Sequence, residues 1–248
     1  MLTLTYRVVA ANAGILLGLS LLLGFLNLGP GSGSNLIAAV VEFAVLGAVT
    51  YCTLRAVLFH KEGASFNVRP SLGHAFQWQE LQPFLVSFVV LSGVYVALFV
   101  AALVGFSVFG GVFAALIPFL RSSGFLSALQ LLAITIILLQ GTASFGTMLV
   151  ASVAGGDRTL RGALARSQVN MWTTTWRLAV GPLQFAIWAH LAIALLLLVL
   201  PHIQSGAFLS AFLAQAAVAS VKLFCNVYIW VIVAVAYLEA QAAGVVSE

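Results

Sequence analysis

The stretch Ala219 to Asn226, which reads ASVKLFCN, places a single lysine inside an apolar run that extends from Phe208 to Leu238. A run of this length can cross the hydrocarbon core of a bilayer as a helix, because a core about 30 Å thick takes about 20 residues. An unpaired ammonium group in hydrocarbon is costly, so Lys222 needs a partner, a route to water or a function. The stretch therefore predicts a membrane-spanning helix that carries one polar group in need of an explanation.

The composition of the whole chain supports the same interpretation. Of 248 residues, 62% are hydrophobic and only 6% are charged, and the mean hydropathy is +1.14. A soluble domain cannot cover that much apolar surface with so few charges. The chain is therefore expected to be an integral membrane protein with almost no soluble portion.

The apolar runs predict an all-α, polytopic transmembrane bundle that forms a single domain, 1–248. The six expected spans are residues 8–28, 35–59, 82–106, 125–150, 175–200 and 208–238. Residues 105–120 are also apolar but contain Gly105, Gly110, Gly111 and Pro118. This segment is open to interpretation as a half-helix, a re-entrant segment or an interfacial segment.

The basic residues predict the orientation, because Lys and Arg in short loops are retained on the cytoplasmic side. Eight of the ten flank one set of loops, and these are Arg7, Arg55, Lys61, Arg69, Arg158, Arg161, Arg166 and Arg177. Both termini are therefore expected in the cytoplasm, in an inner (plasma) membrane of bacterial type. Attraction to anionic lipid headgroups accounts for the basic pI near 9.4, so no nucleic-acid partner is expected.

The connection after the fourth span predicts a short basic amphipathic helix on the inner leaflet. Leu160, Leu164 and Met171 recur at helical spacing, and Thr159 is placed to cap the helix. The basic and aromatic residues expected to face lipid around it are Arg158, Arg161, Arg166, Trp172 and Trp176. Ordinary interfacial anchoring is favoured, and specific recognition of anionic lipid is the alternative. Similar lead-in segments precede the other hairpins, which predicts three hairpin-like repeats.

The repeat register suggests a partner for Lys222. Glu42 lies 21 residues before Gly63, and Lys222 lies 22 residues before Gly244, so the two charges fall at nearly the same depth. We expect an intramembrane ion pair between them, with lone snorkelling of Lys222 as the alternative. Polar residues expected to line the bundle interior are Gln140, Ser144, Gln215 and Asn226. Gly14 and Gly18 are expected to form a close-packing face of the first span.

Motifs that would indicate chemistry are missing from the sequence. The four histidines lack metal-ligand spacing, and neither a Gly-x-Ser-x-Gly motif nor a phosphate-binding loop occurs. Cys52 and Cys225 lie inside expected spans, where they are interpreted as small buried hydrophobic residues. No catalytic residue, no metal site and no cofactor is therefore expected.

The segment Gly155 to Leu183, GGDRTLRGALARSQVNMWTTTWRLAVGPL, resembles a known family. It is similar to the helix entering the fifth span of six-span proteins grouped with the membrane domain of glycerophosphoryl diester phosphodiesterases. The residues that match that pattern are Ala163, Leu164, Arg166, Asn170, Trp172, Arg177 and Leu178. Val169 departs from it, since the family often has glycine there. Weaker likeness extends to YRVVAANAGILLG and AYLEAQAAG near the two ends.

The resemblance implies a six-helix bundle without chemistry of its own, in a family largely of unknown function. Phosphodiesterase activity in fused members belongs to a separate soluble domain, and none is expected here. The favoured function is a non-enzymatic accessory or scaffold protein within the membrane. The alternative is a small transporter or permease-like subunit that uses the interior polar residues. A membrane-protein partner and a homo-oligomer are both left open.

Overall fold

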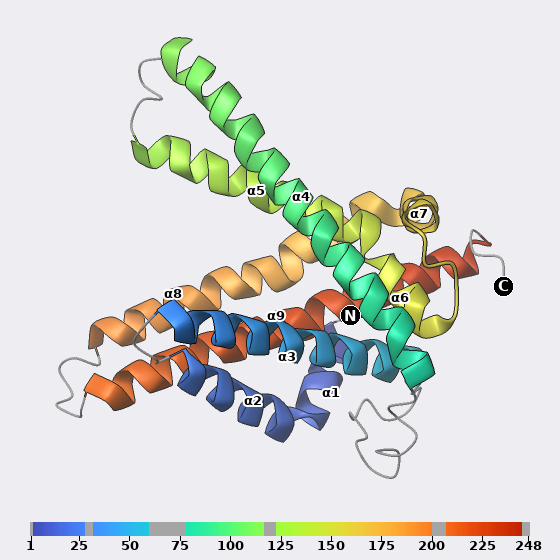
Figure 1. The fold of residues 1–248 in the computed structure, drawn as a ribbon, viewed down its shortest axis with the longest axis horizontal. Coiled ribbons are helices and arrows are strands. Elements are labelled where there is room, and N and C mark those ends of the chain that lie inside the picture. Colours follow the sequence, from blue (N-terminus) through green and yellow to red (C-terminus); the bar gives the residue numbers. More distant parts are fainter. Residues whose placement is uncertain (1, 28–31, 60–77, 117–122, 200–206, 245–248) are drawn as a thin grey trace. The chain divides into compact units, whose positions relative to one another are not determined.

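The computed structural model describes residues 2–27, 32–59, 78–116, 123–199 and 207–244, and helices account for nearly all of them. The helices are α1 (Leu2–Ala11), α2 (Ala13–Leu26), α3 (Ser32–Phe59), α4 (Trp78–Leu116), α5 (Ser123–Phe145), α6 (Thr147–Ala154), α7 (Leu160–Leu178), η2 (Ala179–Leu183), α8 (Gln184–Val199) and α9 (Ala207–Ala242) (Figure 1). The predicted all-α class is confirmed.

Several segments, some of which join consecutive helices, are long and apolar enough to cross a membrane. Within the described residues, five segments qualify, and they are Leu36–Phe59, Leu81–Val108, Leu126–Ala154, Leu160–Leu196 and Leu209–Ala242. A sixth is counted if the bent pair Thr3–Ala11 and Ala13–Leu26 forms one span. The chain is therefore a multi-pass membrane protein.

The chain divides into two compact units, each assembled from segments that are distant in the sequence. Unit 1 comprises residues 1–77 and 176–235, and unit 2 comprises residues 78–175 and 236–248. Neither unit is one continuous stretch of chain. The expectation of a single domain, 1–248, stays a prediction.

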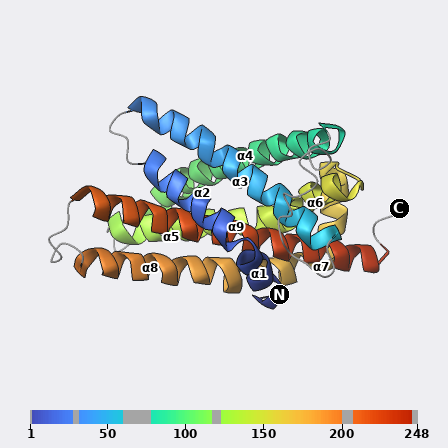
Figure 2. The ribbon, with the colours of Figure 1, turned by 90° about the horizontal axis from the view of Figure 1, so that it is seen from below.

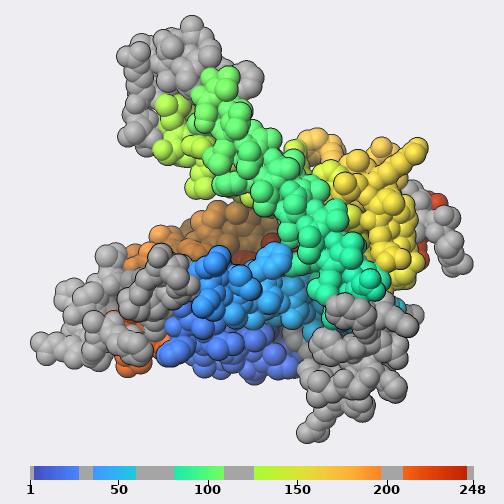
Figure 3. Space-filling model, in the orientation of Figure 1, coloured from blue at the N-terminus to red at the C-terminus, as the bar shows by residue number. Residues whose placement is uncertain are grey.

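Unit 1 is built around α9, with α1, α2 and α3 packed along it (Figures 1 and 2). The contribution of α9 to the core repeats every four residues, which keeps it on one helix face. The core residues are Val8, Leu16, Leu23, Val49, Ala56, Ala219, Leu223, Val227 and Val231. In space-filling view the helices α2 and α3 pack directly against each other (Figure 3).

Unit 2 is formed by α4, α5, α6, the first part of α7 and the end of α9. Helix α4 packs against both α5 and α6. The Tyr95 hydroxyl on α4 donates a hydrogen bond to Thr142 Oγ1 on α5, 3.0 Å away. Phe84, Leu91, Met148 and Leu149 are buried between these helices. The core of this unit is thus apolar, with a polar tie between its two longest helices.

The first expected span, 8–28, is not one straight helix. Its two halves, α1 and α2, meet at Asn12 with a bend of 74°. The backbone of Asn12 has φ −120° and ψ 15°, and its Nδ2 donates to the Val8 carbonyl at 2.6 Å. An amide side chain that bonds to the preceding turn competes with the helical backbone bonds. The break therefore follows from a residue that hydropathy alone does not single out.

Two further expectations about helix ends are corrected. Gly105, Gly110 and Gly111 do not interrupt α4, which continues to Leu116 as part of a 39-residue helix. The expected boundary between the amphipathic helix and the fifth span is only a kink within α7, where Asn170 has φ −146° and ψ 20°. Pro182 then produces the π-helical turn η2, because it lacks the N–H that the preceding turn would bond.

Close helix packing in unit 1 depends on a glycine other than the two expected. Among the described residues, nothing lies within 4 Å of a methyl group added to Gly14 or Gly18. A methyl group at Gly24 would instead lie 2.8 Å from the Ala216 Cα on α9. The backbones of α2 and α9 therefore approach at Gly24, where any larger residue must push them apart.

This contact predicts different outcomes for two identical substitutions on α2. Gly24→Ala should destabilise the protein by about 1–3 kcal/mol, the usual cost of overpacking. Gly18→Ala is the matched control, and it should be neutral or stabilise by up to about 1 kcal/mol through helix propensity. Thermal unfolding in detergent measures both. Equal melting temperatures for the two variants would contradict the proposed close approach.

Candidate functional site

The strongest polar feature of unit 1 is a set of contacts between α3 and α9, here called the α3–α9 polar cluster. It consists of Glu42, Thr50, Lys222, Asn226 and Trp230. Glu42 and Lys222 contact each other at a sequence separation of 180, and Asn226 bonds to the Leu46 carbonyl at the same separation. A constant separation means that the two helices run parallel. The cluster therefore follows the α3–α9 contact for at least one helical turn.

The ion pair expected from the sequence is present in the structure. Lys222 Nζ lies 2.7 Å from Glu42 Oε1. The lysine side chain is 47% exposed and the glutamate side chain 22% exposed, so the pair lies at the rim of the helix contact. Its depth in the bilayer stays a prediction, although both residues fall inside segments able to span a membrane.

Asn226, one turn beyond Lys222, is the most highly connected member of the cluster. Its Nδ2 donates to the Leu46 carbonyl at 3.3 Å and to Thr50 Oγ1 at 3.1 Å. Its Oδ1 accepts a hydrogen bond from Trp230 Nε1 at 3.0 Å. The Thr50 hydroxyl in turn donates to the Leu46 carbonyl at 2.7 Å. Thr50 and Trp230 were not predicted from the sequence, although Trp230 stands four residues after Asn226.

The other three residues expected in the bundle interior have different surroundings. Gln215 is exposed, which corrects its assignment to the interior. Gln215 lies seven residues, or about two helical turns, before Lys222, so both side chains lie on the same outer edge of α9. Asn226 follows Lys222 by four residues, which rotates it about 40° around the helix axis from Lys222, toward α3. In unit 2, Gln140 is half-buried, and the Ser144 hydroxyl donates to Met171 Sδ at 3.4 Å.

In unit 2, Arg166 corrects the expected orientation of α7. This side chain was expected to face lipid, yet it is only 2% exposed. Its Cζ lies 5.5 Å from the centroid of the Tyr237 ring, and its Nε donates to Thr147 Oγ1 at 3.4 Å. Contact with the face of an aromatic ring is a favourable environment for a desolvated guanidinium group.

The buried face of α7 explains the correction. Ala163 and Ser167 are also buried and lie one helical turn from Arg166 or adjacent to it, so all three belong to one face. Leu160 and Leu164, which the sequence places on the apolar face of an amphipathic helix, are exposed. Polar residues of α7 thus face the protein and leucines face outward, the reverse of a soluble helix. The remaining members of the predicted set, Arg158, Arg161, Trp172 and Trp176, are exposed as expected.

Asn170 supplies a second polar contact between α7 and the end of α9. Its Nδ2 donates to the Ala236 carbonyl and to Glu239 Oε2, each at 3.1 Å. The kink in α7 turns this side chain toward α9. The sequence offered no signal for the pairing, because 66 residues separate Asn170 from Ala236.

Thr159 caps the beginning of α7, as predicted from the sequence. The Gly162 N–H donates to Thr159 Oγ1 at 3.0 Å, and Asp157 Oδ1 accepts from the Thr159 N–H at 2.9 Å. The Thr159 hydroxyl also donates to Asp157 Oδ2 at 3.1 Å. These bonds, the backbone one above all, hold the pKa of the exposed Asp157 carboxyl below its ordinary value. Asp157 is therefore ionised at neutral pH beside the start of α7.

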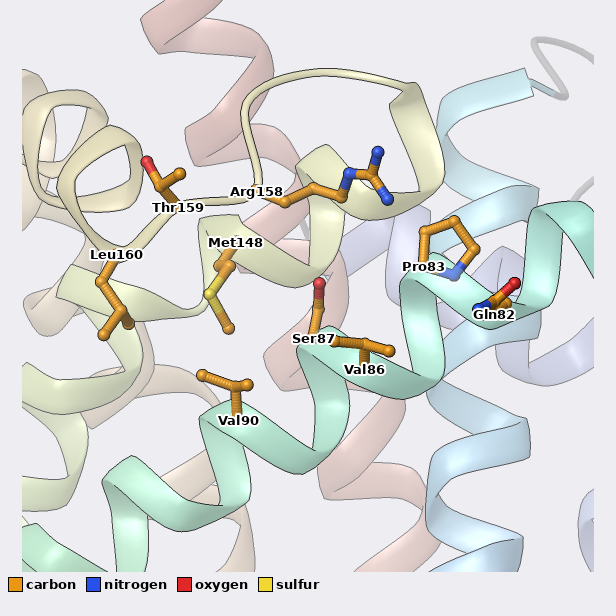
Figure 4. Close-up of a pocket in the computed structure, with 9 residues that line it drawn as sticks. All are labelled: Gln82, Pro83, Val86, Ser87, Val90, Met148, Arg158, Thr159 and Leu160. Carbon is orange, nitrogen blue, oxygen red and sulfur yellow. The ribbon is translucent and has the colours of Figure 1, made fainter.

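A pocket of about 570 Å³ opens next to this turn in unit 2. It lies between the beginning of α4, Met148 of α6 and the residues leading into α7 (Figure 4). Gln82, Ser87 and Arg158 contribute polar groups to its lining, and Val86, Val90 and Met148 contribute apolar ones. No group of three or more metal-ligating side chains occurs within the described part of the chain.

Comparison of the chain with models of protein families, with curated proteins and with solved structures found no match. The resemblance to six-span membrane proteins stays a prediction, and the site is interpreted from its geometry alone.

The Glu42–Lys222 contact generates a prediction that distinguishes pairing from coincidence. Glu42→Gln and Lys222→Met should each lower the melting temperature in detergent, because each leaves one charge at the helix rim without its partner. The double variant should recover most of the loss. The coupling should be about 1–3 kcal/mol, between the values for exposed and for buried pairs. Losses that simply add in the double variant would show that the two charges act independently.

Proposed function

We propose that the chain is a non-enzymatic integral membrane protein that acts as an accessory or scaffold within an inner (plasma) membrane, with both termini in the cytoplasm. The observation that supports this role is the pairing of polar groups within the α3–α9 polar cluster. Asn226 bonds to Thr50, Trp230 and the Leu46 carbonyl. These groups already have partners within the protein.

Such pairing favours a structural role over transport for physical reasons. Lipid tails are as apolar as leucine side chains, so hydrogen bonds between helices contribute directly to helix association. A polar group engaged in this way has to break its bonds before it can bind a substrate. A permeation pathway through the inner part of the cluster would also require water to reach Thr50, which is only 1% exposed.

The surface supports a role that depends on the surrounding membrane. Trp172 and Trp176 of α7 are each 70% exposed, and tryptophan is enriched at the level of the lipid headgroups. Arg158 and Arg161 are exposed near the beginning of the same helix. We infer that these exposed basic and aromatic residues contact anionic headgroups. A scaffold partner, either another protein or a second copy of this chain, would contact the exposed apolar surface of the helices.

The two candidate functions predict different water access to Thr50. In a background of Cys52→Ala and Cys225→Ala, Thr50→Cys should stay unlabelled by a charged methanethiosulfonate reagent applied from either side of the membrane. The expected result follows from the burial of Thr50 against α9. Asp157→Cys in the exposed turn is the positive control, and Leu131→Cys on the exposed apolar surface of α5 reports the background for lipid-facing thiols.

Labelling of Thr50→Cys at a rate similar to that of Asp157→Cys would contradict the scaffold proposal. It would show a water-filled path reaching the α3–α9 polar cluster, and the transporter alternative would then be favoured.

A further inference from the structure

We infer that the pocket of unit 2 binds one anionic phospholipid, with the lipid phosphate at Arg158 and an acyl chain along α4. The pocket volume of about 570 Å³ falls within the roughly 300–1,000 Å³ usual for sites that hold a small molecule. It lies within unit 2 and shares no residue with the α3–α9 polar cluster. The inference is therefore independent of whether the protein is a scaffold or a transporter.

The charged group of the pocket lining lies at one end of the pocket, whereas the polar Thr159 at the other end already bonds to Asp157 through its hydroxyl group. The Arg158 side chain extends toward Gln82 and Pro83, while Val90 and Leu160 lie at the other end of the pocket (Figure 4). Gln82 and Val90 are two turns apart along α4, a rise of about 12 Å. A ligand with an anionic group beside Arg158 and an apolar tail beside Val90 therefore matches the lining of the pocket.

The polar end lies where lipid headgroups are expected. The residues between α6 and α7, from Gly155 to Thr159, are mostly exposed and not helical. Non-helical backbone exposed to lipid does not occur inside the hydrocarbon region, because its polar groups would have no partners. This turn therefore lies at or outside the membrane surface. The segment of α4 that is long and apolar enough to cross a membrane begins at Leu81, so Val86 and Val90 are expected in or near the hydrocarbon.

Charge selects an anionic headgroup. Among the described residues, no carboxylate lies within ion-pair distance of the exposed Arg158 guanidinium. A guanidinium group donates two parallel hydrogen bonds to a phosphate, which makes arginine well suited to bind it. The start of α7 is already capped by Thr159 and Asp157. The inference consequently depends on Arg158 and the divided pocket, without any contribution from the helix terminus.

A phospholipid fits this pocket better than a soluble anion. Inorganic phosphate would occupy the end of the pocket at Arg158 and leave Val86, Val90 and Leu160 uncovered. These three residues are 57%, 42% and 38% exposed. An acyl chain covers them and keeps the phosphate beside Arg158. A lipid therefore satisfies both ends of the pocket at once.

Native mass spectrometry of the purified, delipidated protein tests the inference by titration with phosphatidylglycerol, phosphatidylcholine and inorganic phosphate. Arg158→Gln removes the phosphate ligand. Arg161→Gln is the matched control, since Arg161 is exposed three residues further along, in the first turn of α7, but does not line the pocket. Arg158→Gln should weaken phosphatidylglycerol binding about tenfold or more, and Arg161→Gln less than about twofold. Val86→Trp, which fills the apolar wall, should also abolish tight binding.

Several results would overturn the inference. Equal weakening by Arg158→Gln and Arg161→Gln would show general attraction to positive charge. Equal affinity of the wild-type protein for phosphatidylcholine and phosphatidylglycerol would remove the selection by charge. A soluble anion would be identified as the ligand if inorganic phosphate displaced phosphatidylglycerol completely and if its affinity were unchanged by Val86→Trp. Unchanged melting temperatures of the variants show that each keeps its fold.

Discussion

A polar side chain inside a hydrocarbon layer must find a partner, and the arrangement of unit 1 depends on how α9 meets this requirement. Lys222 and Asn226 are four residues apart on α9, and both find their partners on the parallel helix α3. Hydrocarbon offers no partner for these groups, so the contacts restrict the register and direction of the two helices. The apolar stripe of α9, from Ala219 to Val231, then packs in the register that the polar residues set.

The same requirement explains where the helices of both units bend. The Asn12 side chain donates a hydrogen bond to the Val8 carbonyl in the preceding turn, and α1 and α2 meet there with a bend of 74°. Asn170 leaves helical geometry and donates instead to the end of α9. Pro182 lacks an N–H, and the helix widens into a π-turn around it. Each of these three breaks is thus located at a residue whose hydrogen bonds do not fit a regular helix. Gly105, whose backbone can bond normally, causes no break.

Apolar runs predicted the helical class and most spans because run length reflects bilayer thickness directly. Pairing of Glu42 with Lys222 was also predictable, since isolated opposite charges at equal depth have few alternatives.

The direction in which α7 faces was not predictable. In a membrane, leucines can face outward to lipid while Arg166 faces inward, so helical spacing identifies a face without saying which side is buried. The contacts of Thr50 and Asn170 were not predicted, because an uncharged polar side chain does not by itself indicate which group it bonds to. Gln215 was wrongly predicted to lie in the bundle interior, because a stripe of polar residues on a helix can follow the edge of a helix–helix contact and not its centre.

If hydrogen bonds between α3 and α9 hold unit 1 together, Thr50 and Asn226 must be energetically coupled. A double-mutant cycle with Thr50→Val and Asn226→Leu, measured by reversible unfolding in a bilayer-like detergent mixture, isolates this pair. The account predicts a coupling of about 0.5–1.5 kcal/mol, the range found for hydrogen bonds between membrane helices. Strictly additive losses, or a stabilised Asn226→Leu variant, would contradict it and would leave apolar packing alone to explain why α3 and α9 run side by side.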